Sequence, residues 1–153
     1  MPDIERRASA SWAGDLRSGS GKASTESGVL RDAPITFSSR FEQAAGSNPE
    51  ELIAAAHAAC FSMALSNILS GQGAKPDAIR TTATVTMRRT DSGFTITNIH
   101  LATEGDVPGI DEGAFKAAAE QAKEACPVSR LLKPGLESIT LDARLVGGRM
   151  RNA

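Results

Sequence analysis

Residues 48–71 read NPEELIAAAHAACFSMALSNILSG, and this stretch predicts the longest helix of the chain. Asn48 suits the N-cap position and Pro49 the first helical position. The two glutamates that follow favour the positive end of the helix dipole. We expect the helix to run to about Ser70, because the glycines beyond it are typical of a helix end.

The same stretch raises the question of a membrane span. From Leu52 to Leu69 there is no Lys, Arg, Asp or Glu in 18 residues. Its many alanines, together with His57 and several polar residues, make it too weakly apolar for a helix that faces lipid. We therefore expect a helix buried on most sides of a water-soluble core, and no association with a membrane.

Shorter elements flank the helix. The expected elements are strands at 8–12, 22–30 and 35–41, a hairpin of strands at 79–89 and 94–104, a helix at 112–125, a short helix at 128–133 and a last strand at 138–146. A change of phase in the second hairpin strand predicts a bulge near Asn98. The order of the elements predicts an α+β fold with an antiparallel sheet wrapped on helices.

The length and composition limit the classes of protein. At 153 residues we expect a single domain, residues 1–153, with loose termini at 1–7 and 147–153. The net charge of −1 gives none of the basic excess typical of nucleic-acid binding, and aromatic residues make up only 4%. No apolar signal peptide opens the chain, and two cysteines are too few for a secreted disulfide scaffold. We expect a cytoplasmic protein.

The two cysteines are the candidates for chemistry. Cys60 lies inside the long predicted helix and Cys126 directly precedes Pro127, and neither belongs to a C-x-x-C motif. An apolar helix raises the pKa of a thiol, so a reactive Cys60 requires a nearby cation. Cys126 would lie at the start of a short helix, which favours its thiolate. The residues alone leave open which sulfur attacks, and the alternative for each is an inert packed thiol.

Two side chains are candidates for the cation. Arg40 stays charged at any working pH and can hold both a thiolate and a carboxylate. His57 lies one helical turn from Cys60, but its apolar setting favours a core or interface histidine hydrogen-bonded to a carbonyl. A zinc site built from His57, Cys60, His100 and Cys126 is a rival interpretation that the spacing of these residues does not favour. We expect no metal.

Six motifs follow one another along the chain: W-x-G-D at 12–15, STESGVL at 24–30, RFE at 40–42, NPEELIAAAHAACFSMAL at 48–65, VPGI at 107–110 and CPVS at 126–129. Together they resemble the OsmC/Ohr family of osmotically inducible and organic hydroperoxide resistance proteins, and its OsmC branch more than Ohr. The resemblance covers about residues 9–145. It implies an α+β fold in which antiparallel sheets wrap around long central helices in an intertwined homodimer.

The resemblance also implies a function, that of a thiol peroxidase acting on organic hydroperoxides and less well on hydrogen peroxide. It implies Cys60 as the peroxidatic cysteine, Cys126 as the resolving cysteine, and Arg40 and Glu50 as further active-site residues. Arg17 competes with Arg40, because Ohr proteins take their arginine from an earlier segment. Glu50 would orient Arg40 through a bidentate pair.

In the implied cycle, the peroxidatic cysteine becomes a sulfenic acid and then forms a disulfide with the resolving cysteine. An external dithiol, with a lipoyl protein as one candidate, would restore both thiols, and no cofactor is expected. Three apolar neighbours, Phe61, Met63 and Leu65, would suit an alkyl hydroperoxide as substrate.

The spacing along the long helix adds a geometric expectation. Glu50 and Cys60 are ten residues apart, which corresponds to ~15 Å along a helix axis. One arginine cannot bridge that distance, so we expect two copies of the helix to cross antiparallel near Ala55 and to share each site. Two other functions stay open: a redox-sensing or small-molecule-binding stress protein without turnover, and a structural dimer with packed thiols.

Overall fold

The computed structural model describes residues 1–147, so all but the first residue of the predicted loose end at 147–153 lies outside the described residues. The chain divides into two compact units, the first spanning Met1–Leu52 and the second beginning at Ile53. Helices and strands are both present, which confirms the α+β class. Residues 1–7 form no helix or strand. The single-domain organisation stays a prediction.

The first unit is a small antiparallel sheet followed by a short helix. The sheet contains β1 (Ala8–Ala13), β2 (Ser20–Thr25) and β3 (Ala33–Thr36), hydrogen-bonded in that order. The helix is α1 (Phe37–Phe41). The predicted strand at 22–30 therefore ends earlier, and the prediction of a strand through 35–41 is wrong in its second half. A capping box starts α1 at this point, because the side chains of Thr36 and Ser39 each accept the backbone N–H of the other residue.

The long predicted helix is confirmed as α2 (Pro49–Gly71). Its N-cap is Asn48, whose side-chain oxygen accepts the backbone N–H of Glu51 at 2.8 Å. The boundary between the two compact units falls within this helix.

The burial of α2 differs from the prediction. Only one stripe of α2 is buried, and its residues are spaced four positions apart: His57, Phe61, Leu65 and Leu69. By length and composition α2 could cross a membrane, yet only 22% of its most apolar window is buried in the single chain. The prediction of a helix buried on most sides is therefore wrong for one copy, because the protein packs against a single face.

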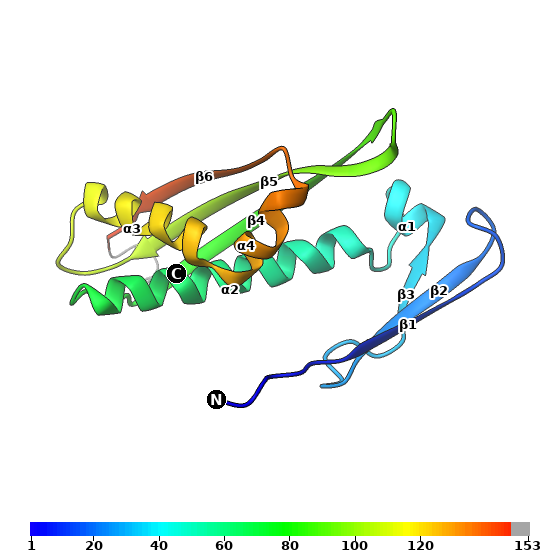
Figure 1. The fold of residues 1–153 in the computed structure, drawn as a ribbon, viewed down its shortest axis with the longest axis horizontal. Coiled ribbons are helices and arrows are strands. Elements are labelled where there is room, and N and C mark those ends of the chain that lie inside the picture. Colours follow the sequence, from blue (N-terminus) through cyan, green and yellow to red (C-terminus); the bar gives the residue numbers. More distant parts are fainter. Residues whose placement is uncertain (148–153) are drawn as a thin grey trace. The chain divides into compact units, whose positions relative to one another are not determined.

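The second unit is built on a sheet of β4 (Ala78–Thr90), β5 (Gly93–Asp106) and β6 (Ser138–Leu145) (Figure 1). The first two strands form the predicted hairpin. The predicted bulge is confirmed, because Thr86 lies opposite Asn98 and Met87 opposite Ile96, which leaves Thr97 as an extra residue.

The pairing of β6 corrects the expectation of an antiparallel sheet, because β6 runs parallel to β5. Between them the chain crosses over through α3 (Glu112–Ala125), α4 (Pro127–Leu132) and the 3-10 helix η1 (Lys133–Gly135). A crossover of this length carries the chain back toward the end at which β5 begins, so that β6 can run in the same direction as β5.

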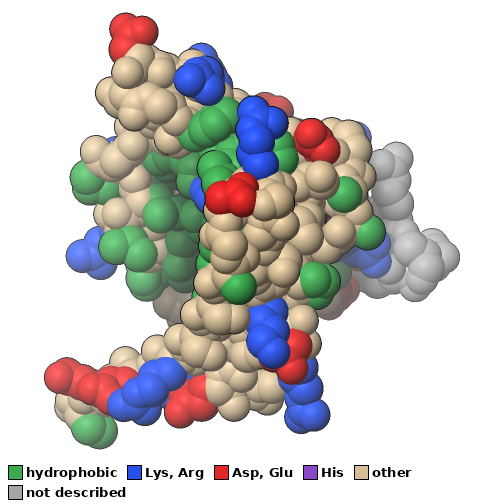
Figure 2. Space-filling view, turned by 90° about the vertical axis from the view of Figure 1, so that its right-hand side faces the viewer, with side chains coloured by type: hydrophobic (Ala, Val, Ile, Leu, Met, Phe, Trp, Pro, Cys, Tyr) green, Lys and Arg blue, Asp and Glu red, His purple; other side chains and the backbone are tan. Residues whose placement is uncertain are grey.

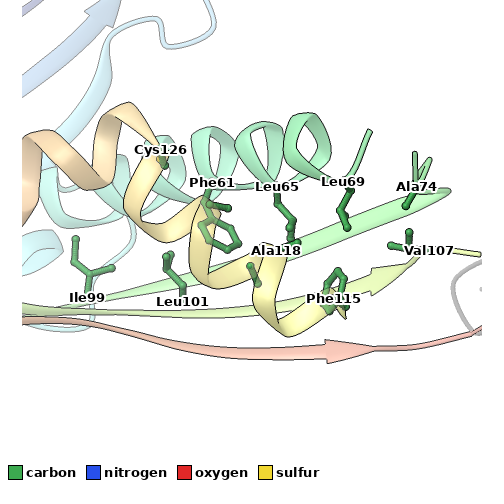
Figure 3. Packing of buried hydrophobic residues seen from close by; sticks show 12 residues of the cluster. Phe61, Leu65, Leu69, Ala74, Ile99, Leu101, Val107, Phe115, Ala118 and Cys126 are labelled. Atoms are coloured by element: carbon green, nitrogen blue, oxygen red, sulfur yellow. The ribbon is translucent and has the colours of Figure 1, made fainter. Parts of the chain in front are cut away.

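The core of the second unit lies between helices and sheet (Figure 3). Phe61 and Leu65 project from α2, Leu101 from β5 and Phe115 from α3, and all four side chains are fully buried. Cys126, at the junction of α3 and α4, belongs to the same cluster and is also fully buried. The junction that carries the second thiol is therefore fixed against the core.

Candidate functional site

The two thiols meet within the second unit. Cys60 lies on α2 and is partly exposed, whereas Cys126 is fully buried at the residue that ends α3 and begins α4. Their side chains are in hydrogen-bond contact, and both are free thiols. A solute can reach only the partly exposed sulfur. The difference in burial thus favours Cys60 as the attacking thiol, which sequence reasoning from the residues alone had left open.

The surroundings of Cys60 do not favour its thiolate. Burial raises the pKa of the Cys60 thiol, the backbone N–H of Val128 lowers it by bonding the sulfur, and contact with Cys126 raises it. The net pKa lies above the usual value. A positive charge from elsewhere is therefore required for a thiolate at neutral pH.

Arg40 of α1 and Glu50 in the first turn of α2 form an ion pair within the first unit. The Arg40 Nε and Nη2 atoms lie 3.2 Å and 2.9 Å from the same oxygen, Glu50 Oε1. Glu50 Oε2 is buried without a hydrogen-bond partner among the described residues. The pairing agrees with the expectation, but the expected bidentate geometry is wrong, because both bonds end on one oxygen.

An apolar cavity of about 430 Å³ lies beside Arg40 in the same unit. Its lining is formed by Trp12, Gly14, Leu16, Ile35, Thr36, Phe37, Arg40, Phe41 and Pro49. The Arg40 guanidinium also lies 5.2 Å from the centre of the Phe41 ring. Arg17, the competing arginine, stacks on Phe37 at 4.9 Å instead. Sequence reasoning missed this cavity, although the chain contains only one Trp and five Phe and three of these six aromatic residues line it.

The apolar residues expected to receive an alkyl group are placed differently. Phe61 and Leu65 are fully buried in the core, so they cannot contact a substrate. Met63 is 73% exposed. The expectation for the two buried residues is therefore wrong, because the stripe of α2 that carries them faces the sheet (Figure 3).

His57 is a fully buried core histidine. Its Nε2 atom lies 2.6 Å from the Ser129 hydroxyl, rather than against the expected carbonyl. Burial lowers the pKa of the His57 imidazole, so the ring is neutral and cannot serve as the cation near Cys60.

The zinc interpretation finds no support in the described part of the chain. His100 lies on β5, where its ring bonds Thr140 and approaches Asp142 at 3.2 Å. Within residues 1–147, no group of three or more His, Cys, Asp or Glu side chains is arranged to hold a metal ion.

Comparison with known proteins places these residues in a family context. Residues 42–140 match the family described as OsmC-like protein. The chain is 51% identical over 142 residues to the peroxiredoxin OsmC of Escherichia coli, covering 93% of this chain and 97% of that protein.

Solved structures agree with the fold. A Legionella pneumophila organic hydroperoxide resistance protein OsmC superposes with a TM-score of 0.72 at 23% identity, over 95% of this chain and 100% of that one. The organic hydroperoxide resistance protein OhrB of Bacillus subtilis gives a TM-score of 0.67 at 26% identity, over 92% and 98%.

Proposed function

Because the chain belongs to the OsmC-like protein family, we propose that it is a thiol peroxidase that reduces organic hydroperoxides to alcohols. The observation that carries this function is the contact between a partly exposed thiol, Cys60, and a buried one, Cys126. The E. coli relative is named a peroxiredoxin, and the B. subtilis relative an organic hydroperoxide resistance protein.

The reaction proceeds in three steps. The Cys60 thiolate attacks the distal oxygen of the hydroperoxide, so that a sulfur–oxygen bond forms, the oxygen–oxygen bond breaks, and the alkoxide takes a proton to become the alcohol. Cys126 then attacks the oxidised sulfur, which forms a disulfide and releases water. An external dithiol reduces this disulfide by two successive exchanges and is itself oxidised to a disulfide.

Arg40, held by Glu50, supplies the positive charge that the surroundings of Cys60 lack. The guanidinium stabilises the thiolate before attack and the departing alkoxide during it. Glu50 holds this guanidinium at the edge of the apolar cavity, where an alkyl group suits the lining better than water or hydrogen peroxide does. The geometry therefore favours an organic hydroperoxide over a small polar oxidant.

We propose further that the active protein is a homodimer with shared sites. Glu50 and Cys60 lie on one continuous helix, ~15 Å apart along its axis, so a second copy is needed to bring an Arg40–Glu50 pair to each thiol. Large apolar side chains such as Met63 and Leu131 are 73% and 75% exposed on the single chain, and hydrophobic side chains are open to solvent in Figure 2. A second copy would cover the open faces of α2, which explains its apolar composition without a membrane.

The reductant and the compartment belong to the same proposal. A disulfide formed inside the protein is most directly reduced by a small dithiol or by a protein-bound one such as a lipoyl group. Such a cycle requires a reducing compartment, so we place the protein in the cytoplasm.

Turnover of cumene hydroperoxide in the presence of a dithiol tests the function. Cys60→Ser should abolish consumption, and Cys126→Ser should permit a single turnover and then stall. The wild-type protein should consume cumene hydroperoxide faster than hydrogen peroxide. Unchanged consumption by Cys60→Ser would refute the proposed chemistry, and binding without consumption would indicate a sensor.

A further inference from the structure

The hydrogen bond between His57 and Ser129 connects two distant parts of the chain. The His57 Nε2 atom lies 2.6 Å from the Ser129 Oγ atom, across 72 positions of sequence. The two residues are 0% and 1% exposed. A buried polar pair of this kind is costly to leave unmade, so it holds the two segments together in one arrangement.

Each residue of this pair lies three positions from one of the thiols. His57 precedes Cys60 by three residues on α2, and Ser129 follows Cys126 by three residues in α4. Residues three apart lie on the same side of a helix, so the bond joins the segments that carry the thiols about one turn away from them. Val128, next to Ser129, donates its backbone N–H to the Cys60 sulfur. The thiol contact, this N–H contact and the histidine–serine bond thus connect α2 to the same short segment.

The short segment needs such a connection. The helix α4 has only six residues, and its N-cap, Cys126, makes no side-chain capping bond. Helices of this length are not stable alone, so tertiary contacts must fix the position of α4. Pro127 also interrupts the preceding helix and removes a backbone donor at the junction.

We propose that His57 and Ser129 form a positioning pair that holds the first turn of α4 against α2 and keeps Cys126 within reach of the oxidised Cys60 sulfur. The inference rests on the proposed function. Neither residue touches the peroxide. They act through the placement of the second thiol.

The step that depends on this placement is the closure of the disulfide. Cys126 loses its proton and its sulfur attacks the Cys60 sulfur of the sulfenic acid. A sulfur–sulfur bond forms, the sulfur–oxygen bond breaks, and the leaving hydroxide combines with the proton as water. Disulfide geometry is strict, so a displaced α4 slows this closure. Peroxide attack forms no bond to the second sulfur, and the contacts of Val128 and Cys126 shift the Cys60 pKa in opposite directions, so the first step is affected less.

The test separates the two steps. The reduced protein is mixed with tert-butyl hydroperoxide, quenched at intervals, and examined by intact mass for sulfenic acid, disulfide and overoxidised sulfinic acid. Ser129→Ala should form the sulfenic acid at nearly the wild-type rate but close the disulfide about tenfold more slowly, and excess peroxide should then produce sulfinic acid. Ser129→Thr retains the hydroxyl and should restore closure.

Ser62→Ala is the matched control. Ser62 lies two residues after Cys60 on the same helix, but its hydroxyl bonds Thr81 of β4 at 2.8 Å rather than α4. This variant should close the disulfide at the wild-type rate. Should Ser129→Ala fail to fold, His57→Gln changes the same bond from the side of α2 and is measured in the same way. Closure at the wild-type rate without the bond, or equal slowing in Ser62→Ala, overturns the proposal.

A second measurement distinguishes failure of this inference from failure of the proposed function. Glutathione disulfide converts Cys60 to a mixed disulfide with release of one glutathione, and Cys126 then displaces the second glutathione. This closure needs no peroxide. If the wild-type protein does not react with hydroperoxides, the proposed function fails, yet slow closure in Ser129→Ala and normal closure in Ser129→Thr would still support the positioning pair.

Discussion

Arg40 holds Glu50 through a single carboxylate oxygen, with both of its hydrogen bonds ending on Oε1. The Glu50 side chain is only 12% exposed, and its second oxygen is buried without a partner among residues 1–147. The pair therefore constrains the guanidinium on one side and leaves a buried acceptor on the other. In the proposed dimer, a donor from the second copy would satisfy that oxygen.

The first prediction follows from this pair. In Glu50→Gln the amide is neutral and holds the guanidinium less firmly, so we expect oxidation of Cys60 by cumene hydroperoxide to slow on the order of 10- to 100-fold. Stopped-flow measurement of the second-order rate constant checks this. Glu51→Gln is the matched control, because Glu51 is exposed on the same helical turn, and its rate constant should stay at the wild-type value. Equal rate constants for Glu50→Gln and wild type would contradict the assigned role.

The second prediction concerns the shared site. A Cys60→Ser chain is inactive as a homodimer, and a Glu50→Gln chain retains only the slowed rate of the first prediction. In a mixed dimer, the intact cysteine of one chain faces the intact glutamate of the other, which rebuilds one site. Random mixing after co-refolding should therefore recover about a quarter of the wild-type activity per chain.

The control for this experiment places both substitutions in the same chain. In the mixed dimer of a doubly substituted chain with wild type, the wild-type cysteine faces a glutamine and the wild-type glutamate faces a serine, so neither site is intact and this species should be as slow as the Glu50→Gln homodimer or slower. Co-expression with two affinity tags isolates the mixed species. Absence of recovery in an isolated mixed dimer of the two single variants would show that each site lies within one chain.

Much of the fold could be predicted from local signals. Asn48 and Pro49 mark the start of α2. Asp111 caps α3, because the Asp111 side chain accepts the backbone N–H of Ala114 at 2.8 Å. These caps act over three or four residues, so the sequence carries them directly. Alternation likewise predicted β4 and β5, because both strands have one face in contact with the core.

What could not be predicted depends on distant contacts. The five-residue helix α1 is the exception, because its signals are local: a capping box at Thr36 and the rings of Phe37 and Phe41, which pack 4.9 Å apart. It was missed because the alternation of apolar and polar residues at 35–41 also fits a strand. The parallel direction of β6 is set by the crossover before it, and periodicity is the same in either direction. The bond from His57 to Ser129 joins positions with no local relation, so only folding reveals it.

The third prediction is a pH dependence of stability. Because burial lowers the pKa of His57 in the folded state, the unfolded chain binds a proton more readily as the pH falls below the ordinary histidine pKa of about 6.5. Above that pH the ring is neutral in both states and the folded protein has its full stability. Below it the unfolded chain takes up the proton first, so stability is lost progressively. We expect the free energy of unfolding to fall by up to about 1.4 kcal/mol per pH unit in that window.

Urea unfolding at about pH 7.5 and about pH 5.5, at one protein concentration, measures this dependence. The chain has two histidines, so the control is direct. His57→Gln should lose most of the difference between the two pH values, and His100→Gln should retain it. The same slope in His57→Gln and wild type would show that other groups carry the pH dependence.

The last prediction tests the packing between β5 and α3. A Cβ atom added at Gly105 on β5 would lie 2.3 Å from Phe115 Cε2, and this phenylalanine is fully buried. Neither ring nor strand can move without disturbing the core, so Gly105→Ala should lower the free energy of unfolding by about 1–3 kcal/mol. Gly71→Ala adds the same methyl group at the end of α2 with no atom within 4 Å, and it should leave stability unchanged or slightly raised. Urea unfolding of both variants decides the matter, and equal stability of the two would mean that the Phe115 ring is not packed against this strand.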